Sequence, residues 1–242
     1  MVNNNIKVID DLLLNYPRSI EFVNQVNFIF DNANMDINTR LDSLYYIGTY
    51  LYSKYKFNHA ISILENLVSL VDSPSSSLDD KILRLKSYSL TYLGLAENVL
   101  GNYQQAIDYH NQSLKIAERI GDVDSESRCY TNLGIAAYAL GNYQQAIDYH
   151  NQALEISQRI GDISGEGRCY SNLGAAARAL GNYQQAIDYY NQALDIAQRI
   201  GDLSLEGACY GNLGAAADAL GNYQQAIDYH NQALEISQEL GM

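Results

Sequence analysis

The sequence predicts an all-α fold, a solenoid of stacked antiparallel helical hairpins, from three observations. One nine-residue segment, Gly-Asn-Tyr-Gln-Gln-Ala-Ile-Asp-Tyr, recurs every 40 residues and begins at Gly101, Gly141, Gly181 and Gly221. Proline occurs only twice in 242 residues and never within these repeats. Apolar residues recur at helical spacing inside each repeat. A fixed period of this length is typical of repeat proteins, whose units cannot bury their apolar faces alone and therefore stack on their neighbours.

The first helix of a repeat is expected to begin at an aspartate and to end at a glycine. In the repeat over 122–161, Asp122 is a favourable N-cap residue, and Gly141 stands where a left-handed backbone conformation is needed to end the helix. The apolar residues between them are expected to form a core stripe, composed of Tyr130, Leu133, Gly134, Ala137 and Leu140.

The second helix of the repeat is expected to follow directly and to run back along the first. Asn142 would cap it, and Gln145 three residues later approaches a capping box. Gly161 would end the helix and Asp162 would start the next repeat. The expected core residues of this helix are Tyr143, Ala146, Ile147, His150, Ala153 and Leu154.

The chain is expected to contain three sections. Residues 1–38 are predicted to form N-terminal capping helices, and residues 39–81 a degenerate repeat followed by a loop rich in serine and proline. The degenerate repeat is indicated by Ile47-Gly48, which matches Leu133-Gly134. Residues 82–242 are predicted to form four regular repeats of 40 residues, over 82–121, 122–161, 162–201 and 202–241. No polar capping helix follows the last repeat, so this end would be free to contact another molecule.

Composition excludes several classes of function. The net charge is −13, whereas nonspecific binding to nucleic acid or to an anionic membrane needs a basic surface. No apolar stretch approaches the roughly 20 residues that span a bilayer, and the first residues, Met1 to Asn5, lack the pattern of a signal peptide. A cytoplasmic protein that binds neither nucleic acid nor membrane is therefore expected.

The three cysteines, Cys129, Cys169 and Cys209, occupy the same place in successive repeats. Packed helices lie roughly 8–10 Å apart, whereas a disulfide needs Cα atoms within about 7 Å, so these cysteines are expected to be buried and unpaired. Neither CxxC nor HxxxH spacing is present. The histidines at 110, 150 and 230 are expected to be packing residues, because one per repeat cannot converge on a metal. No metal and no cofactor are predicted.

The repeat resembles the tetratricopeptide repeat. The signature aromatic-x-x-Leu-Gly is present as Tyr130 to Gly134, Tyr170 to Gly174 and Tyr210 to Gly214. The period of 40 residues, and the missing proline after the second helix, are similar to the forty-residue subtype found in Pins-type polarity scaffolds and in many bacterial, especially cyanobacterial, proteins. The resemblance implies a right-handed superhelix. It also implies a concave groove, in which the Pins-type scaffolds hold extended peptides through arginines and asparagines of the first helices.

Differences between the repeats indicate where a ligand would bind. The second helices are almost identical, whereas the first helices differ mainly at positions that are three, four and three residues apart and so share one face of a helix. In the tetratricopeptide fold this face lines the concave groove. The candidate peptide-binding residues on it are Arg128, Thr131, Asn132, Ile135, Tyr138, Arg168, Asn172, Arg178, Asn212 and Asp218.

Two residue types in this set suit a peptide. Asn132, Asn172 and Asn212 would form a ladder of amides, each able to donate to and accept from a peptide backbone. Arg128 and Arg168 would hold carboxylates in bidentate pairs. Three alternatives remain open: the asparagines bond a neighbouring helix, the arginines form surface ion pairs with Glu126 and Glu166 or their neighbours, or the differences are neutral drift after duplication.

No nucleophile motif, phosphate-binding loop or convergent acid–base group is present, so the chain is not expected to be an enzyme. The leading prediction is an interaction module or scaffold that binds an extended peptide or a partner protein in its groove. One alternative is a self-assembling repeat protein, forming head-to-tail or swapped homo-oligomers through the uncapped C-terminal repeat. Another is a regulatory sensor whose curvature changes when it binds a small molecule or a signalling peptide.

Overall fold

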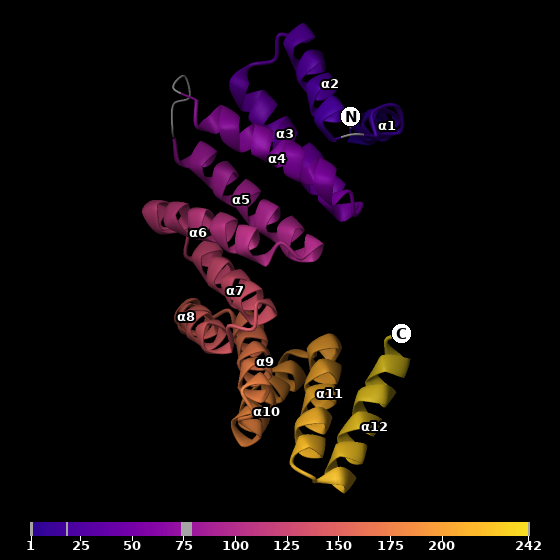
Figure 1. Cartoon of the computed structure of the whole chain (residues 1–242), viewed down its shortest axis with the longest axis vertical. Coiled ribbons are helices and arrows are strands. Elements are labelled where there is room, and N and C mark those ends of the chain that lie inside the picture. The colour runs from indigo at the N-terminus through magenta and orange to yellow at the C-terminus, as the bar shows by residue number, and fades with distance from the viewer. Residues whose placement is uncertain (1, 18, 74–78, 242) are drawn as a thin grey trace. The chain divides into compact units, whose positions relative to one another are not determined.

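The computed structural model describes residues 2–17, 19–73 and 79–241, and in these ranges the chain is helical, with no β-strand (Figure 1). The helices are α1 (Val2–Asn15), α2 (Ser19–Asn32), α3 (Ile37–Ser53), α4 (Phe57–Val71), α5 (Asp80–Leu100), α6 (Tyr103–Ile120), α7 (Val123–Ala139), α8 (Tyr143–Ile160), α9 (Ile163–Ala179), α10 (Tyr183–Ile200), α11 (Leu203–Ala219) and α12 (Tyr223–Glu239). The predicted all-α fold of helical hairpins is confirmed.

Each regular repeat is a hairpin that turns at a left-handed glycine. Gly141 has φ +81°, and its N–H donates to the carbonyl of Tyr138 at 2.9 Å. The N–H of Asn142 donates to the carbonyl of Ala137, also at 2.9 Å. These two bonds satisfy carbonyls at the end of α7 in the manner of a Schellman motif. Gly161 likewise has φ +74°, which confirms the predicted helix ends.

The capping box predicted at Asn142 and Gln145 is wrong. Asn142 does precede α8, but its side chain makes no capping hydrogen bond. A capping box requires the N–H of the N-cap residue to be free for the Gln side chain. Here the same N–H is already bonded to Ala137 at the end of α7. The turn is so short that Asn142 belongs to both helix ends.

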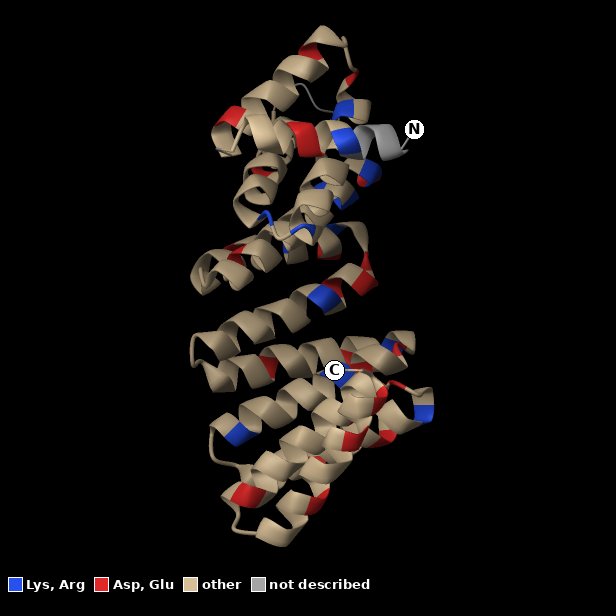
Figure 2. Cartoon of the chain, turned by 90° about the vertical axis from the view of Figure 1, so that its right-hand side faces the viewer, with Lys and Arg blue, Asp and Glu red and all other residues tan. Residues whose placement is uncertain are grey.

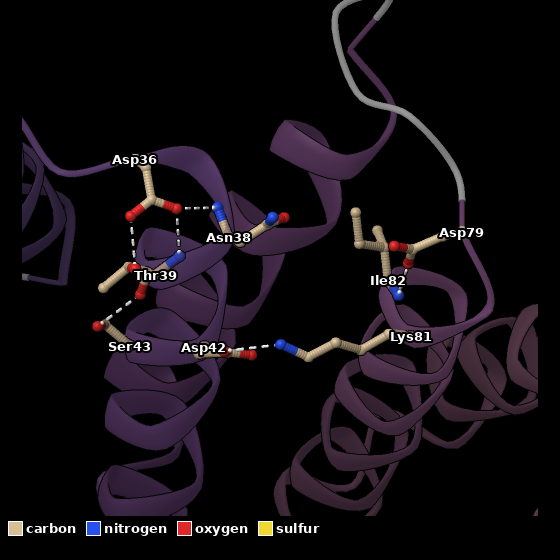
Figure 3. Close-up of polar contacts among 8 residues, drawn as sticks. All are labelled: Asp36, Asn38, Thr39, Asp42, Ser43, Asp79, Lys81 and Ile82. Atoms are coloured by element: carbon tan, nitrogen blue, oxygen red, sulfur yellow. Dashed lines mark hydrogen bonds and ion pairs between the residues drawn. The ribbon is translucent and has the colours of Figure 1, made fainter.

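The predicted aspartate caps are confirmed. The carboxylates of Asp122, Asp162 and Asp202 each accept a hydrogen bond from the backbone N–H three residues later, at 3.2, 2.9 and 3.0 Å. The same device starts α3 and α5, where Asp36 and Asp79 cap the helices (Figure 3). Such caps satisfy N–H groups that the helix itself leaves unpaired.

The core of each hairpin contains a close contact between a glycine on the first helix and a side chain on the second. A Cβ added at Gly134 would lie 2.4 Å from the ring of His150, and one added at Gly174 would lie 2.6 Å from the ring of Tyr190. His150 is 2% exposed and Tyr190 is fully buried. Only glycine allows the helices to approach this closely while a ring lies between them.

The same contact identifies the degenerate repeat. A Cβ on Gly48 in α3 would lie 2.5 Å from Leu64 in α4, and these residues have the sequence separation of Gly134 and His150. The hairpin of α3 and α4 therefore packs as the regular repeats do. The serine and proline residues at 74–77 lie outside the described residues, and the division of the chain at 38/39 and 81/82 stays a prediction.

Five of the predicted core residues are not fully buried in the structure: Leu140 is exposed, and Tyr130, Tyr143, Ile147 and Leu154 are half-buried. Leu140 is 41% exposed because it lies in the turn after α7, beside Gly141. Tyr130 is only half-buried, and its ring packs against that of Tyr149 with centroids 6.4 Å apart. The three cysteines are buried, as predicted, and no disulfide joins them.

The chain forms two compact units, Met1–Ser125 and Glu126–Met242. The first contains the buried residues Phe22, Leu44 and Leu67 in its core. The second contains α8 to α12 and most of α7, with Tyr190 and Leu213 among its buried residues. The candidate peptide-binding residues all belong to the second unit.

Candidate peptide-binding surface

The candidate residues lie on the exposed side of the first helices α7, α9 and α11. The opposite side of these helices is buried through residues such as Leu133, Leu173 and Leu213. Among the candidates, Arg128, Ile135, Arg168 and Asp218 are exposed, and Thr131, Asn132, Tyr138, Asn172, Arg178 and Asn212 are half-buried. Helices α9 and α11 contact each other, so their candidate residues lie on neighbouring helices. We call this set of ten residues the first-helix stripe.

The asparagines of the first-helix stripe retain their hydrogen-bonding capacity. Among the described residues, no hydrogen bond involves the side-chain amides of Asn132, Asn172 or Asn212, although each residue is half-buried. The alternative in which these amides serve to bond a neighbouring helix therefore finds no support in the structure. An amide offers two N–H donors and a carbonyl acceptor, which match the alternating groups of an extended backbone.

Arg168 is already engaged on its own helix. Its guanidinium donates to the hydroxyl of Ser164 at 2.7 Å and lies 3.8 Å from the carboxylate of Asp162. Glu166, the partner considered from the sequence, instead accepts a hydrogen bond from Gln158 at 3.0 Å. An exposed pair of this kind contributes about 0–1 kcal/mol, so Arg168 can change partners at little cost.

Two other members of the first-helix stripe, Thr131 and Ile135, carry no charge. The hydroxyl of Thr131 donates to the backbone carbonyl of Ser127 at 3.0 Å, a bond within its own helix. Ile135 is 44% exposed and offers an apolar contact. These two residues add shape and apolar area to the stripe rather than charge.

One residue near the stripe was not among the sequence-based candidates. Tyr190 in α10 is fully buried. Its hydroxyl nevertheless has no hydrogen-bond partner among the described residues, and the same is true of the buried Nε of Arg178. The sequence signal was the tyrosine itself, at a position where the other three regular repeats carry histidine.

The environment of Tyr190 shifts the pKa of its hydroxyl in two opposite directions. Burial raises the pKa of the phenol, while the nearby guanidinium of Arg178 acts in the opposite direction. The two groups therefore lie close together, although the hydroxyl of Tyr190 and the Nε of Arg178 each lack a hydrogen-bond partner among the described residues. Tyr138 of α7 is the next phenol in this neighbourhood, and it also raises the pKa of Tyr190.

Three further features of the described residues bear on basic surfaces, metal sites and membrane-spanning helices. Lys and Arg residues are scattered among Asp and Glu rather than gathered along one helix (Figure 2). No group of three or more potential metal ligands is present in the described residues. Among the described helices, none is sufficiently long and apolar to cross a membrane.

Comparison with protein families gives a match over most of the repeat region. A family model described as Tetratricopeptide repeat matches residues 86–159 and 167–239, which together exceed half of the chain. No curated protein sequence is detectably similar to the chain.

Several solved structures have a similar fold. BtubC (BKLC) from P. vanneervenii is 19% identical with a TM-score of 0.74, over 96% of this chain and 92% of that one. A putative kinesin light chain with nearly identical TPR-like repeats from Podosopora anserina is 20% identical with a TM-score of 0.69, over 86% and 99%. The Rap conjugation gene regulator of plasmid pLS20, in complex with the Phr* peptide, is 17% identical with a TM-score of 0.66, over 87% of this chain and 57% of that one. At these identities the likeness concerns the fold.

Proposed function

Because the chain belongs to the tetratricopeptide repeat family, we propose that it is a non-enzymatic interaction module that binds an extended peptide segment of a partner protein along the first-helix stripe. The observation that carries this proposal is the set of half-buried amides at Asn132, Asn172 and Asn212, which have no hydrogen-bond partner in the described chain. Three identical amides, one per 40 residues, suit a ligand whose own polar groups repeat.

Two further features support the proposal. A solved structure of similar fold is a regulator in complex with a peptide. The three cysteines are buried and none is in a disulfide, which suits a reducing compartment such as the cytoplasm, where we place the protein as part of this proposal.

The amides can be tested with a defined probe. Acetylated and amidated dodecapeptides with degenerate sequence would be passed over the immobilised chain, and single retained peptides would be measured by fluorescence anisotropy. Replacement of Asn132, Asn172 and Asn212 by alanine together is expected to weaken binding at least about tenfold, because each lost hydrogen bond contributes roughly 0.5–1.5 kcal/mol and about 1.4 kcal/mol corresponds to a factor of ten.

The chain offers a matched control for this experiment. Asn151, Asn191 and Asn231 occur once per repeat on the second helices and are exposed. Their replacement by alanine changes the same number of amides away from the first-helix stripe and is expected to leave binding unchanged. Equal losses in both triple variants would contradict a peptide site on the first helices.

Self-association is a second candidate, favoured by the exposed apolar residues of α12. Tyr223, Ile227 and Leu234 are 66%, 53% and 56% exposed, whereas their equivalents in α10 are half-buried. We expect a second copy of the chain to cover this face. The mass in sedimentation equilibrium should then rise with concentration. Ile227→Lys should prevent the rise and Gln232→Lys, also on α12, should not; a constant monomer mass would contradict this candidate.

A further inference from the structure

The repeat over 162–201 differs from the other regular repeats at two positions at once. In the first-helix stripe it carries Arg178, where the others carry Asn98, Tyr138 and Asp218. In the second helix it carries Tyr190, where the others carry histidine. The structure brings these two differences together in one place.

The ring of Tyr190 explains how it reaches Arg178. Like His150 on Gly134, it lies against a glycine of the first helix, with Cε1 2.6 Å from the position of a Cβ on Gly174. A phenol is longer than an imidazole and carries its hydroxyl beyond the glycine. Arg178 follows Gly174 by one helical turn, on the same side of α9. The hydroxyl therefore ends beside the guanidinium of Arg178, which also acts to lower the pKa of Tyr190.

Both groups are left with unused hydrogen-bonding capacity. The Tyr190 hydroxyl and the Arg178 Nε are buried and have no partner among the described residues. Unpaired buried polar groups destabilise a fold and call for an explanation, of which an absent ligand is one. Arg178 as a whole is only half-buried, so part of its side chain remains accessible to a ligand.

We propose that Arg178 anchors a carboxylate, the side chain of an Asp or Glu in the bound peptide, and that Tyr190 positions the guanidinium for it. This inference rests on the proposed function, and it names one class of residue that the first-helix stripe selects. The carboxylate would pair with the terminal guanidinium nitrogens in the bidentate manner typical of arginine. A small shift of the side chain would then let Nε donate to the hydroxyl of Tyr190, which satisfies both buried groups.

Tyr138 completes the surroundings of the carboxylate. It is half-buried on α7, and its ring packs on that of Tyr143 with centroids 5.2 Å apart. No hydrogen bond to its hydroxyl is present in the described chain, so this phenol can donate to a carboxylate on Arg178. The other three regular repeats lack the pair of arginine and tyrosine, so the selectivity is expected at one position of the peptide.

The test compares two pools of acetylated, amidated dodecapeptides that are identical except for one fixed residue, Glu in one and Gln in the other. The blocked ends remove terminal charges, and scanning the fixed residue along the peptide locates the subsite. The parent chain is expected to prefer Glu about tenfold at one position, since hydrogen bonds to charged groups are the stronger ones. Arg178→Gln should abolish the preference, whereas Arg199→Gln, an exposed arginine on α10, should retain it.

Tyr190→Phe separates a positioning role from a structural one. It removes a buried hydroxyl that has no partner, so the free energy of unfolding should stay equal or rise, while the preference for Glu falls severalfold. A loss of stability in Tyr190→Phe would show that the hydroxyl is structural and would overturn its assignment.

The remaining outcomes are distinct. Peptide binding without a preference for Glu, or a preference that persists in Arg178→Gln, would overturn the carboxylate subsite and leave the proposed function standing. Retention of neither pool by the parent chain would overturn both.

Discussion

Gly134→Ala is expected to lower the free energy of unfolding by about 2–3 kcal/mol, the upper part of the range for overpacked cores. The new Cβ would lie 2.4–2.6 Å from three atoms of the His150 ring. Because His150 is only 2% exposed, the ring has no free space to enter, and α7 and α8 must separate. Urea unfolding followed by circular dichroism would measure the change.

Gly214→Ala is the matched control for this effect. Its Cβ would approach His230 at 2.5 Å, nearly the same contact, but His230 is exposed and can rotate away. The alanine should then contribute its higher helix propensity, about 1 kcal/mol, and Gly214→Ala should be neutral or stabilising. Similar losses in both variants would show that the contact itself, and not the confinement of the ring, determines the cost.

The chain is expected to lose stability as the pH falls from 7.5 to 5.5, by roughly 1.4 kcal/mol for each buried histidine. Burial lowers the pKa of His110 and His150 to about 4, from an ordinary value of 6.5. The unfolded chain therefore binds more protons than the folded chain between these values. The stability that the neutral rings provide is complete above pH 6.5, declines as the pH falls, and is lost once the pH passes below about 4.

The geometry of the two rings supports this expectation. The two ring nitrogens of His110 are buried, and neither has a hydrogen-bond partner among the described residues. His150 likewise has an unpaired Nδ1. An imidazolium at either place would carry an unsolvated charge.

Unfolding measured at pH 7.5 and 5.5 would test the expectation. His150→Tyr, which copies the residue at Tyr190, should remove about half of the pH-dependent loss. Tyr190→Phe changes the same position of another repeat and keeps both buried histidines, so its pH dependence should match that of the parent. A parent chain whose stability does not change between these pH values would contradict the burial of neutral rings.

The proposed surface was predicted from the sequence only in part. Comparison of the repeats located the first-helix stripe, because the variable positions share one face of each first helix. That comparison did not reveal that Arg168 bonds Ser164 and Asp162. Nor did it place Tyr190 beside Arg178, because these residues lie on different helices and meet only through the packing at Gly174.

The sequence by itself determined the features that depend on neighbouring residues. The period set the hairpins, glycines such as Gly141 ended helices because they adopt a positive φ without strain, and aspartates such as Asp162 began them by accepting a nearby N–H. Only the tertiary structure decided which groups remain unpaired. The N–H of Asn142 is used by the preceding helix, Leu140 lies outside the core, and the hydroxyl of Tyr190 and the Nε of Arg178 each lack a hydrogen-bond partner among the described residues. Burial and pairing of this kind depend on contacts between helices, whose distances and angles are not encoded in any single repeat.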